Sequence, residues 1–63
     1  MELAAMIKKA RKDLNLTQKD LADKVGTNQS YVSQLENGYI SPSLSHAMAI
    51  AKELHIKLDD LNL

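Results

Sequence analysis

Residues 17–37, TQKDLADKVGTNQSYVSQLEN, decide the fold of this 63-residue chain. Thr17 and Asn28 each precede a run that suits a helix, and both are residue types that cap a helix N-terminus by accepting a backbone N–H. Gly26 lies between the two runs and suits the left-handed conformation that ends a helix. The stretch therefore predicts two short helices joined by a tight turn, which is the pattern of a helix-turn-helix.

The second of these helices has two unlike faces. Val32 and Leu35 lie one turn apart and predict the buried face. The opposite face carries uncharged hydrogen-bonding side chains, which are Gln29, Ser30, Ser33, Gln34 and Asn37. An α-helix fits the major groove of DNA, where an amide side chain pairs with adenine and a serine pairs with either kind of base pair. Because this polar face belongs to the second helix of a helix-turn-helix, it indicates a helix that reads DNA and not an ordinary solvated helix face.

The flanking segments complete an all-α fold. Upstream, apolar residues recur at helical spacing, at Leu3, Met6, Ile7, Ala10 and Leu14. Downstream, Ser43 is the expected cap of a helix whose buried stripe is Leu44, Ala47, Ile50, Ala51 and Leu54. Residues 58–61 suit a short fifth helix, and we expect Met1, Met6 and Met48 to pack in the core or at the ends. We therefore expect one compact domain of four to five helices over residues 1–63.

Composition argues against several classes of protein. The chain has no cysteine, which removes disulfides and thiolate sites. His46 and His55 belong to no carboxylate cluster, so we expect neither a metal site nor a cofactor. A phosphate-binding glycine loop and a nucleophile–base arrangement are both missing, so we expect no enzyme. No apolar run reaches the roughly 18–20 residues of a membrane span, and the start does not resemble a secretion signal. We expect a soluble cytoplasmic protein with no membrane partner.

Several runs together carry a family resemblance. They are LTQKDLA at 16–22, VGTNQSYVSQLENG at 25–38, PSL at 42–44, IAK at 50–52 and LDDL at 58–61. This pattern, over nearly the whole chain, resembles the lambda-repressor/Cro-type (XRE) family of transcriptional regulators in its single-domain form. The resemblance implies a lambda-repressor-like fold, a bacterial or phage origin, and binding of double-stranded DNA in the major groove.

The resemblance also implies roles for matching positions. Base edges are expected to be contacted by Gln29, Ser30, Ser33 and Gln34. We expect phosphates to be contacted by Thr17, Gln18, Lys19, Asn28, Tyr31, Asn37 and Tyr39, and among these the resemblance itself implies Gln18 and Asn37. Gln18 is expected to brace the recognition helix as well. Arg11 and Glu36 match a buried ion pair between the first and third helices, so we assign Arg11 to structure and not to DNA.

Two departures from the family pattern concern binding strength. The loop after Gly38 reads Tyr39-Ile40-Ser41, where relatives often carry Lys or Arg, and His55-Ile56-Lys57 replaces the usual Gly-Val-Ser. The net charge is zero, with eight basic and eight acidic residues. Because the salt dependence of DNA binding follows the number of neutralised phosphates, we expect a log–log slope no steeper than about −6 per monomer.

Two functions remain open on sequence grounds. A repressor would bind a two-fold operator as a homodimer, because one recognition helix reaches only a few base pairs. Leu58, Leu61 and Leu63 offer a dimer interface, although apolar residues at a chain end also pack on their own domain. The alternative is a protein-interaction module, such as the antitoxin of a toxin–antitoxin pair, which the neutral net charge favours. Lys8, Lys9 and Lys12 suit either a solvated helix face or a phosphate contact.

Overall fold

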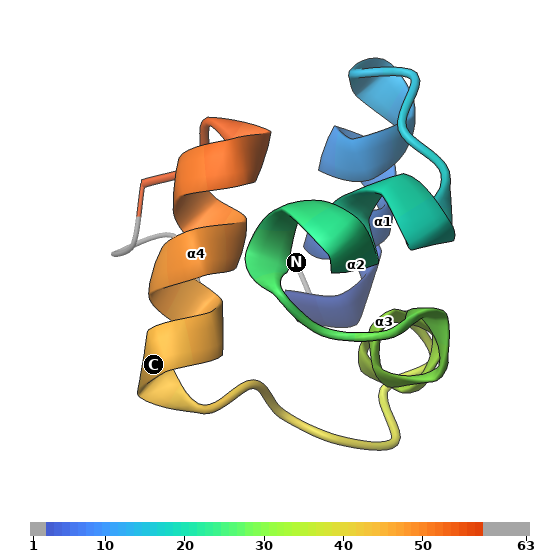
Figure 1. Cartoon of the computed structure of the whole chain (residues 1–63), viewed down its shortest axis with the longest axis vertical. Coiled ribbons are helices and arrows are strands. Elements are labelled where there is room, and N and C mark those ends of the chain that lie inside the picture. The colour runs from blue at the N-terminus through green and yellow to red at the C-terminus, as the bar shows by residue number, and fades with distance from the viewer. Residues whose placement is uncertain (1–2, 58–63) are drawn as a thin grey trace.

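Four α-helices make up the part of the chain that the structure describes. The computed structural model describes residues 3–57. Its helices are α1 (Leu3–Asp13), α2 (Gln18–Val25), α3 (Gln29–Glu36) and α4 (Leu44–Leu54), with no strand among these residues. Helix α2 packs against both α3 and α4, and α1 packs against the same two helices; Figure 1 views α3 almost end-on. The all-α prediction is confirmed, whereas the predicted helix at 58–61 lies outside the described residues.

The predicted N-terminal caps of three helices are confirmed. Thr17 Oγ1 accepts the backbone N–H of Asp20 at 3.0 Å, and the Asp20 carboxylate accepts the backbone N–H of Thr17 at 2.9 Å. This reciprocal pair is a complete capping box. Asn28 Oδ1 accepts the N–H of Tyr31 at 2.8 Å, and Ser43 caps α4. These caps define the residues at which α2, α3 and α4 begin.

Every described helix is followed by a residue in the left-handed conformation. These residues are Asn15, Gly26, Gly38 and His55. Helix α3 ends at Glu36, two residues before Gly38. The turn beyond it is closed by two backbone bonds, from Tyr39 N–H to Gln34 O and from Gly38 N–H to Leu35 O, which form a Schellman motif around the glycine. The motif starts the following loop at a defined angle from α3.

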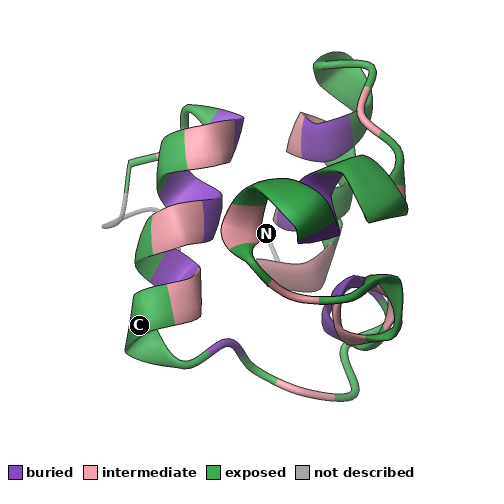
Figure 2. Ribbon diagram, in the orientation of Figure 1, coloured by how far each residue is buried: buried purple, intermediate pink, exposed green. Residues whose placement is uncertain are grey.

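The core lies where the inward faces of the helices meet. Its largest fully buried side chains are Ile7, Leu21, Val32 and Ile50, and each comes from a different helix. Leu35 and Leu54 extend the same cluster, and Ala47 with Ala51 forms a smaller one against Met6. Figure 2 shows the buried stretches of α4 alternating with exposed ones along the helix. The core therefore holds α2 and α3 as a unit against α1 and α4.

Two apolar residues that were predicted to be buried, Leu14 and Leu44, are exposed, and so is Met48, which was expected to pack in the core or at an end. Leu14 is 41% exposed, Leu44 64% and Met48 54%. Leu14 follows the last residue of α1, so it no longer follows the helical periodicity that predicted its burial. Leu44 is the first residue of α4, and Met48 lies one turn further on the same side of the helix. Within residues 3–57 the core stripe of α4 is Ala47, Ile50, Ala51 and Leu54.

Candidate nucleic-acid interface

The polar side of α3 lies at the surface. Gln29, Ser30 and Gln34 are exposed and Ser33 is half-buried. The Gln34 amide donates to Ser30 Oγ at 3.3 Å, and the Asn37 amide donates to Ser33 Oγ at 3.4 Å. Each amide thereby uses only one N–H, and its carbonyl oxygen and second N–H stay available. The structure thus brings the four predicted base-reading residues together on one helix, with donors and acceptors to offer.

A buried ion pair anchors the opposite side of α3. Arg11 Nε donates to Glu36 Oε2 at 2.7 Å and Arg11 Nη2 donates to Glu36 Oε1 at 3.0 Å, while Nη1 donates to the carbonyl of Leu16 at 2.7 Å. Arg11 is 7% and Glu36 9% exposed. The hydrogen bond that Arg11 donates to Glu36 raises the pKa of Arg11, and desolvation opposes this rise. The pair joins α1 to α3 and to the start of the helix-turn-helix, which is the structural role expected of it.

Gln18 on α2 connects this ion pair to Gln29, the first residue of α3. Its Nε2 donates to Glu36 Oε1 at 3.2 Å, and its Oε1 accepts from Gln29 Nε2 at 3.4 Å. The bracing that the family resemblance implied is therefore visible as a side-chain hydrogen bond between α2 and α3. The link from Gln18 to Glu36 was not predicted. No periodicity in the sequence indicates it, because it depends on where α1, α2 and α3 meet.

The capping residues keep hydrogen-bond donors for a further partner. The oxygens of Thr17 and Asn28 accept backbone N–H groups, and the two N–H donors of the Asn28 amide stay free. A phosphate accepts hydrogen bonds and donates none, so these free donors are the groups it needs. Asp20 lies beside Thr17, and the hydrogen bond from the Thr17 backbone N–H lowers the pKa of Asp20, with a smaller effect of the Thr17 side chain.

Charge is scarce on this surface. Among the predicted phosphate contacts Lys19 is the only basic residue. Its Nζ lies 3.1 Å from Asp23 Oδ2, and both side chains are exposed. Asn37 and Tyr39 follow at the far end of α3, with Tyr39 77% exposed. The surface therefore offers many neutral donors and one cation that already has a partner.

Tyr31 on α3 contacts His46 on α4. Its ring lies 4.7 Å from the ring of His46, centroid to centroid, with a tilt of 42°. His46 Nδ1 lies 3.1 Å from Ser43 Oγ. This contact ties the half-buried Tyr31 on α3 to the first turn of α4. Among residues 3–57, no group of three or more potential metal ligands occurs.

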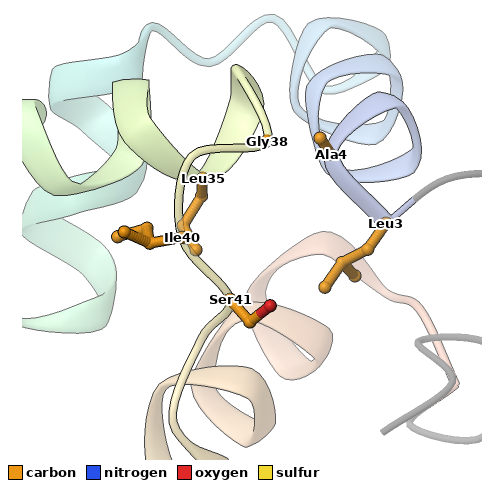
Figure 3. Close-up of a pocket in the computed structure, with 6 residues that line it drawn as sticks. All are labelled: Leu3, Ala4, Leu35, Gly38, Ile40 and Ser41. Carbon is orange, nitrogen blue, oxygen red and sulfur yellow. The ribbon is translucent and has the colours of Figure 1, made fainter.

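A hollow lies on another part of the surface. It has a volume of about 270 Å³ and is lined by Leu3, Ala4, Leu35, Gly38, Ile40 and Ser41. Figure 3 shows it between the start of α1 and the loop that follows α3. None of the lining residues is charged, so the hollow offers no ionic contact to a ligand. Separately, no helix in residues 3–57 is long and apolar enough to cross a bilayer.

Known proteins resemble the chain over most of its length. The helix-turn-helix family model matches residues 7–61. An uncharacterised HTH-type transcriptional regulator of Methanocaldococcus jannaschii is 43% identical over 47 residues, which are 75% of this chain and 71% of the relative. The immunity repressor protein of Bacillus phage phi105 is 38% identical over 58 residues, or 92% of this chain and 40% of the repressor.

Solved structures give the same result. The P22 c2 repressor, crystallised in complex with a synthetic operator, superposes with a TM-score of 0.93 at 28% identity. The match covers 97% of this chain and 92% of that one. These relatives are named as a transcriptional regulator and as repressors. The chain belongs to the helix-turn-helix family of lambda-repressor-like, DNA-binding transcriptional regulators.

Proposed function

We propose that the chain represses transcription by binding a specific DNA sequence with α3 in the major groove. The observation that carries this proposal is the outer face of α3, where Gln29, Ser30, Ser33 and Gln34 keep free hydrogen-bonding groups. Such groups distinguish base pairs by their major-groove edges. The similarity to the P22 c2 repressor, whose structure holds an operator, supports this placement.

Phosphate contacts hold the helix in register. We assign them to Thr17, Gln18, Lys19, Asn28, Tyr31, Asn37 and Tyr39. Most of these residues are neutral donors, and Lys19 exchanges Asp23 for a phosphate when DNA binds. Neutral donors release few counterions, so affinity falls only gently with salt, with a log–log slope no steeper than about −6 per monomer.

A homodimer supplies the remaining specificity. One eight-residue recognition helix contacts only a few base pairs, and a second half-site about one helical turn away doubles the sequence that is read. We assign the dimer contact to Leu58, Leu61 and Leu63, which lie outside the described residues. Sedimentation at micromolar concentration tests this assignment, with a shift to monomer expected for Leu61→Asp.

Selection of bound sequences from a random duplex pool tests the function directly. We expect a two-fold symmetric site with half-sites about 10 base pairs apart. On that site, Gln29→Ala and Gln34→Ala should each weaken binding about five- to 150-fold, the range for one bidentate base contact. Met48→Ala, at an exposed position of α4, is the matched control and should leave affinity within twofold. Base reading is wrong if both glutamine variants also stay within twofold.

The protein-interaction alternative predicts a different result. A DNA-binding protein retains weak affinity for any duplex at low salt. No mobility shift at about 50 mM salt with tens of micromolar protein would therefore favour a module that binds protein through this fold.

A further inference from the structure

We propose that the buried pair Arg11–Glu36 fixes, through Gln18, which end of the Gln29 amide faces the DNA. The four side chains form one continuous chain of hydrogen bonds from the inside of the protein to the outer face of α3. The inference rests on the proposed base-reading role of Gln29. Arg11 and Glu36 act in it as positioning residues, since both are buried.

The direction of each hydrogen bond follows from the chemistry of the groups. A carboxylate paired with a guanidinium accepts hydrogen bonds and donates none. Gln18 therefore presents its NH₂ group to Glu36 Oε1, at 3.2 Å, and its carbonyl oxygen lies on the other side. That oxygen also only accepts, so Gln29 presents an N–H to it, at 3.4 Å. Glu36 thus determines which end of the Gln18 amide donates and, through Gln18, which end of the Gln29 amide donates.

This polarity matters for base recognition. Gln29 keeps its carbonyl oxygen and one N–H for DNA, and their positions are no longer interchangeable. An adenine is read when the amide oxygen accepts from N6 and the amide N–H donates to N7. A reversed amide places a donor opposite N6 and an acceptor opposite N7. A fixed amide therefore selects adenine in one position of the site, whereas a freely turning amide selects it less strictly.

The variant Glu36→Gln tests the direction of the hydrogen bonds that run from Arg11 to Gln29. Arg11 donates only, so it takes the carbonyl oxygen of the introduced amide and turns its NH₂ group towards Gln18. Gln18 and then Gln29 reverse in response. The preference for adenine at the base pair read by Gln29 should fall about five- to 150-fold, measured with duplexes that differ only at that base pair.

The variant Gln18→Met separates positioning from stability. It interrupts the hydrogen-bond chain and removes one hydrogen bond to Glu36, but it leaves both residues of the ion pair in place. It should relax the adenine preference by itself. In the Gln18→Met background, Glu36→Gln should change the preference no further. Circular dichroism establishes a temperature at which the variants are folded. If Glu36→Gln does not fold at any temperature, the adenine preference of Gln18→Met alone serves as the test.

Two outcomes overturn the proposal. One is an unchanged adenine preference in the folded Glu36→Gln variant or in Gln18→Met, while Gln29→Ala abolishes that preference. The other is an equal loss for Glu36→Gln with and without Gln18→Met, which a purely stabilising ion pair would give. Failure of the proposed function is distinct, because Gln29→Ala would then leave base preference unchanged.

Discussion

The ion pair Arg11–Glu36 and the pairs Lys9–Asp13 and Lys19–Asp23 place the same kinds of charge at similar distances in opposite surroundings. The closest N–O distances are 2.7, 2.9 and 3.1 Å. The Arg11 and Glu36 side chains are 9% and 2% exposed, whereas those of the other four residues are at least 63% exposed. Distance alone therefore does not rank these interactions.

Burial makes the difference, because water no longer replaces a lost partner. Removing one member of a buried pair leaves an uncompensated charge, which costs about 3–5 kcal/mol. An exposed pair on a helix contributes about 0.3–0.5 kcal/mol. The buried pair also serves three elements at once, since Arg11 holds α1 to Glu36 on α3 and to the carbonyl of Leu16. The buried ion pair therefore fixes how α1 and α3 lie against each other, whereas the exposed pairs contribute little to the stability of this arrangement.

The largest expected effect tests that ranking. Arg11→Met keeps the length of the side chain but leaves the Glu36 carboxylate buried without its partner, and we expect a loss of about 3–5 kcal/mol. A chain of this size has only about 3–9 kcal/mol of stability in total, so the variant should be largely unfolded at 37 °C. Urea denaturation followed by circular dichroism measures it.

A matched double variant controls for lost packing. Arg11→Met with Glu36→Leu removes both charges and should recover most of the stability, because no buried group then remains unpaired. If Arg11→Met alone costs less than about 1 kcal/mol, which is the range of exposed pairs, the contrast between the two kinds of ion pair is wrong.

Sequence patterns predicted the local features of this fold well. Thr17, Gly26 and Asn28 act at helix ends through their own side chain or backbone, so a few neighbouring residues suffice to predict them. The periodicity failed at Leu14 and Leu44, because burial at a helix end depends on whether another element reaches that far. Helical spacing describes one helix and contains nothing about its neighbours.

The candidate site likewise contains features that local sequence predicts and features that depend on contacts between helices. The polar face of α3 follows from residue types and spacing, and the resemblance supplied the pair Arg11–Glu36. The hydrogen bond from Gln18 to Glu36 joins residues 18 positions apart in the sequence. The contact of Tyr31 with His46 joins α3 and α4, which are separated in the sequence by a loop. Both depend on the crossing of helices, which no stretch of one helix specifies.

The N-terminal cap of α2 should have an intermediate effect. Thr17 is exposed, but its hydroxyl satisfies a backbone N–H that the helix itself leaves free. Thr17→Ala should destabilise the chain by about 1 kcal/mol, whereas Thr17→Ser retains the hydroxyl and should stay close to the original stability. Thermal unfolding without DNA measures both. Equal losses for alanine and serine would assign the effect to the methyl group and not to the cap.

Acid should weaken the same cap through Asp20. Hydrogen bonds from Thr17 lower the pKa of Asp20 below its usual value of 3.8, so the folded state binds that proton less readily than the unfolded state. The stability from this group is present above the unfolded pKa and is lost as the pH falls through the folded pKa. Urea midpoints between pH 6 and pH 2.5 should therefore fall less for Asp20→Asn than for the original chain. The same fall in both would remove Asp20 from the explanation.

The smallest effect is expected at Lys9–Asp13, where both partners are exposed on α1. Lys9→Gln should change the free energy of unfolding by less than about 0.5 kcal/mol, since an exposed pair four residues apart contributes about 0.3–0.5 kcal/mol. The small loss should disappear at 1 M salt, where the Debye length is about 3 Å. Urea denaturation at low and high salt measures both effects. A loss above about 1 kcal/mol that persists in 1 M salt would show that exposure does not separate these pairs from Arg11–Glu36.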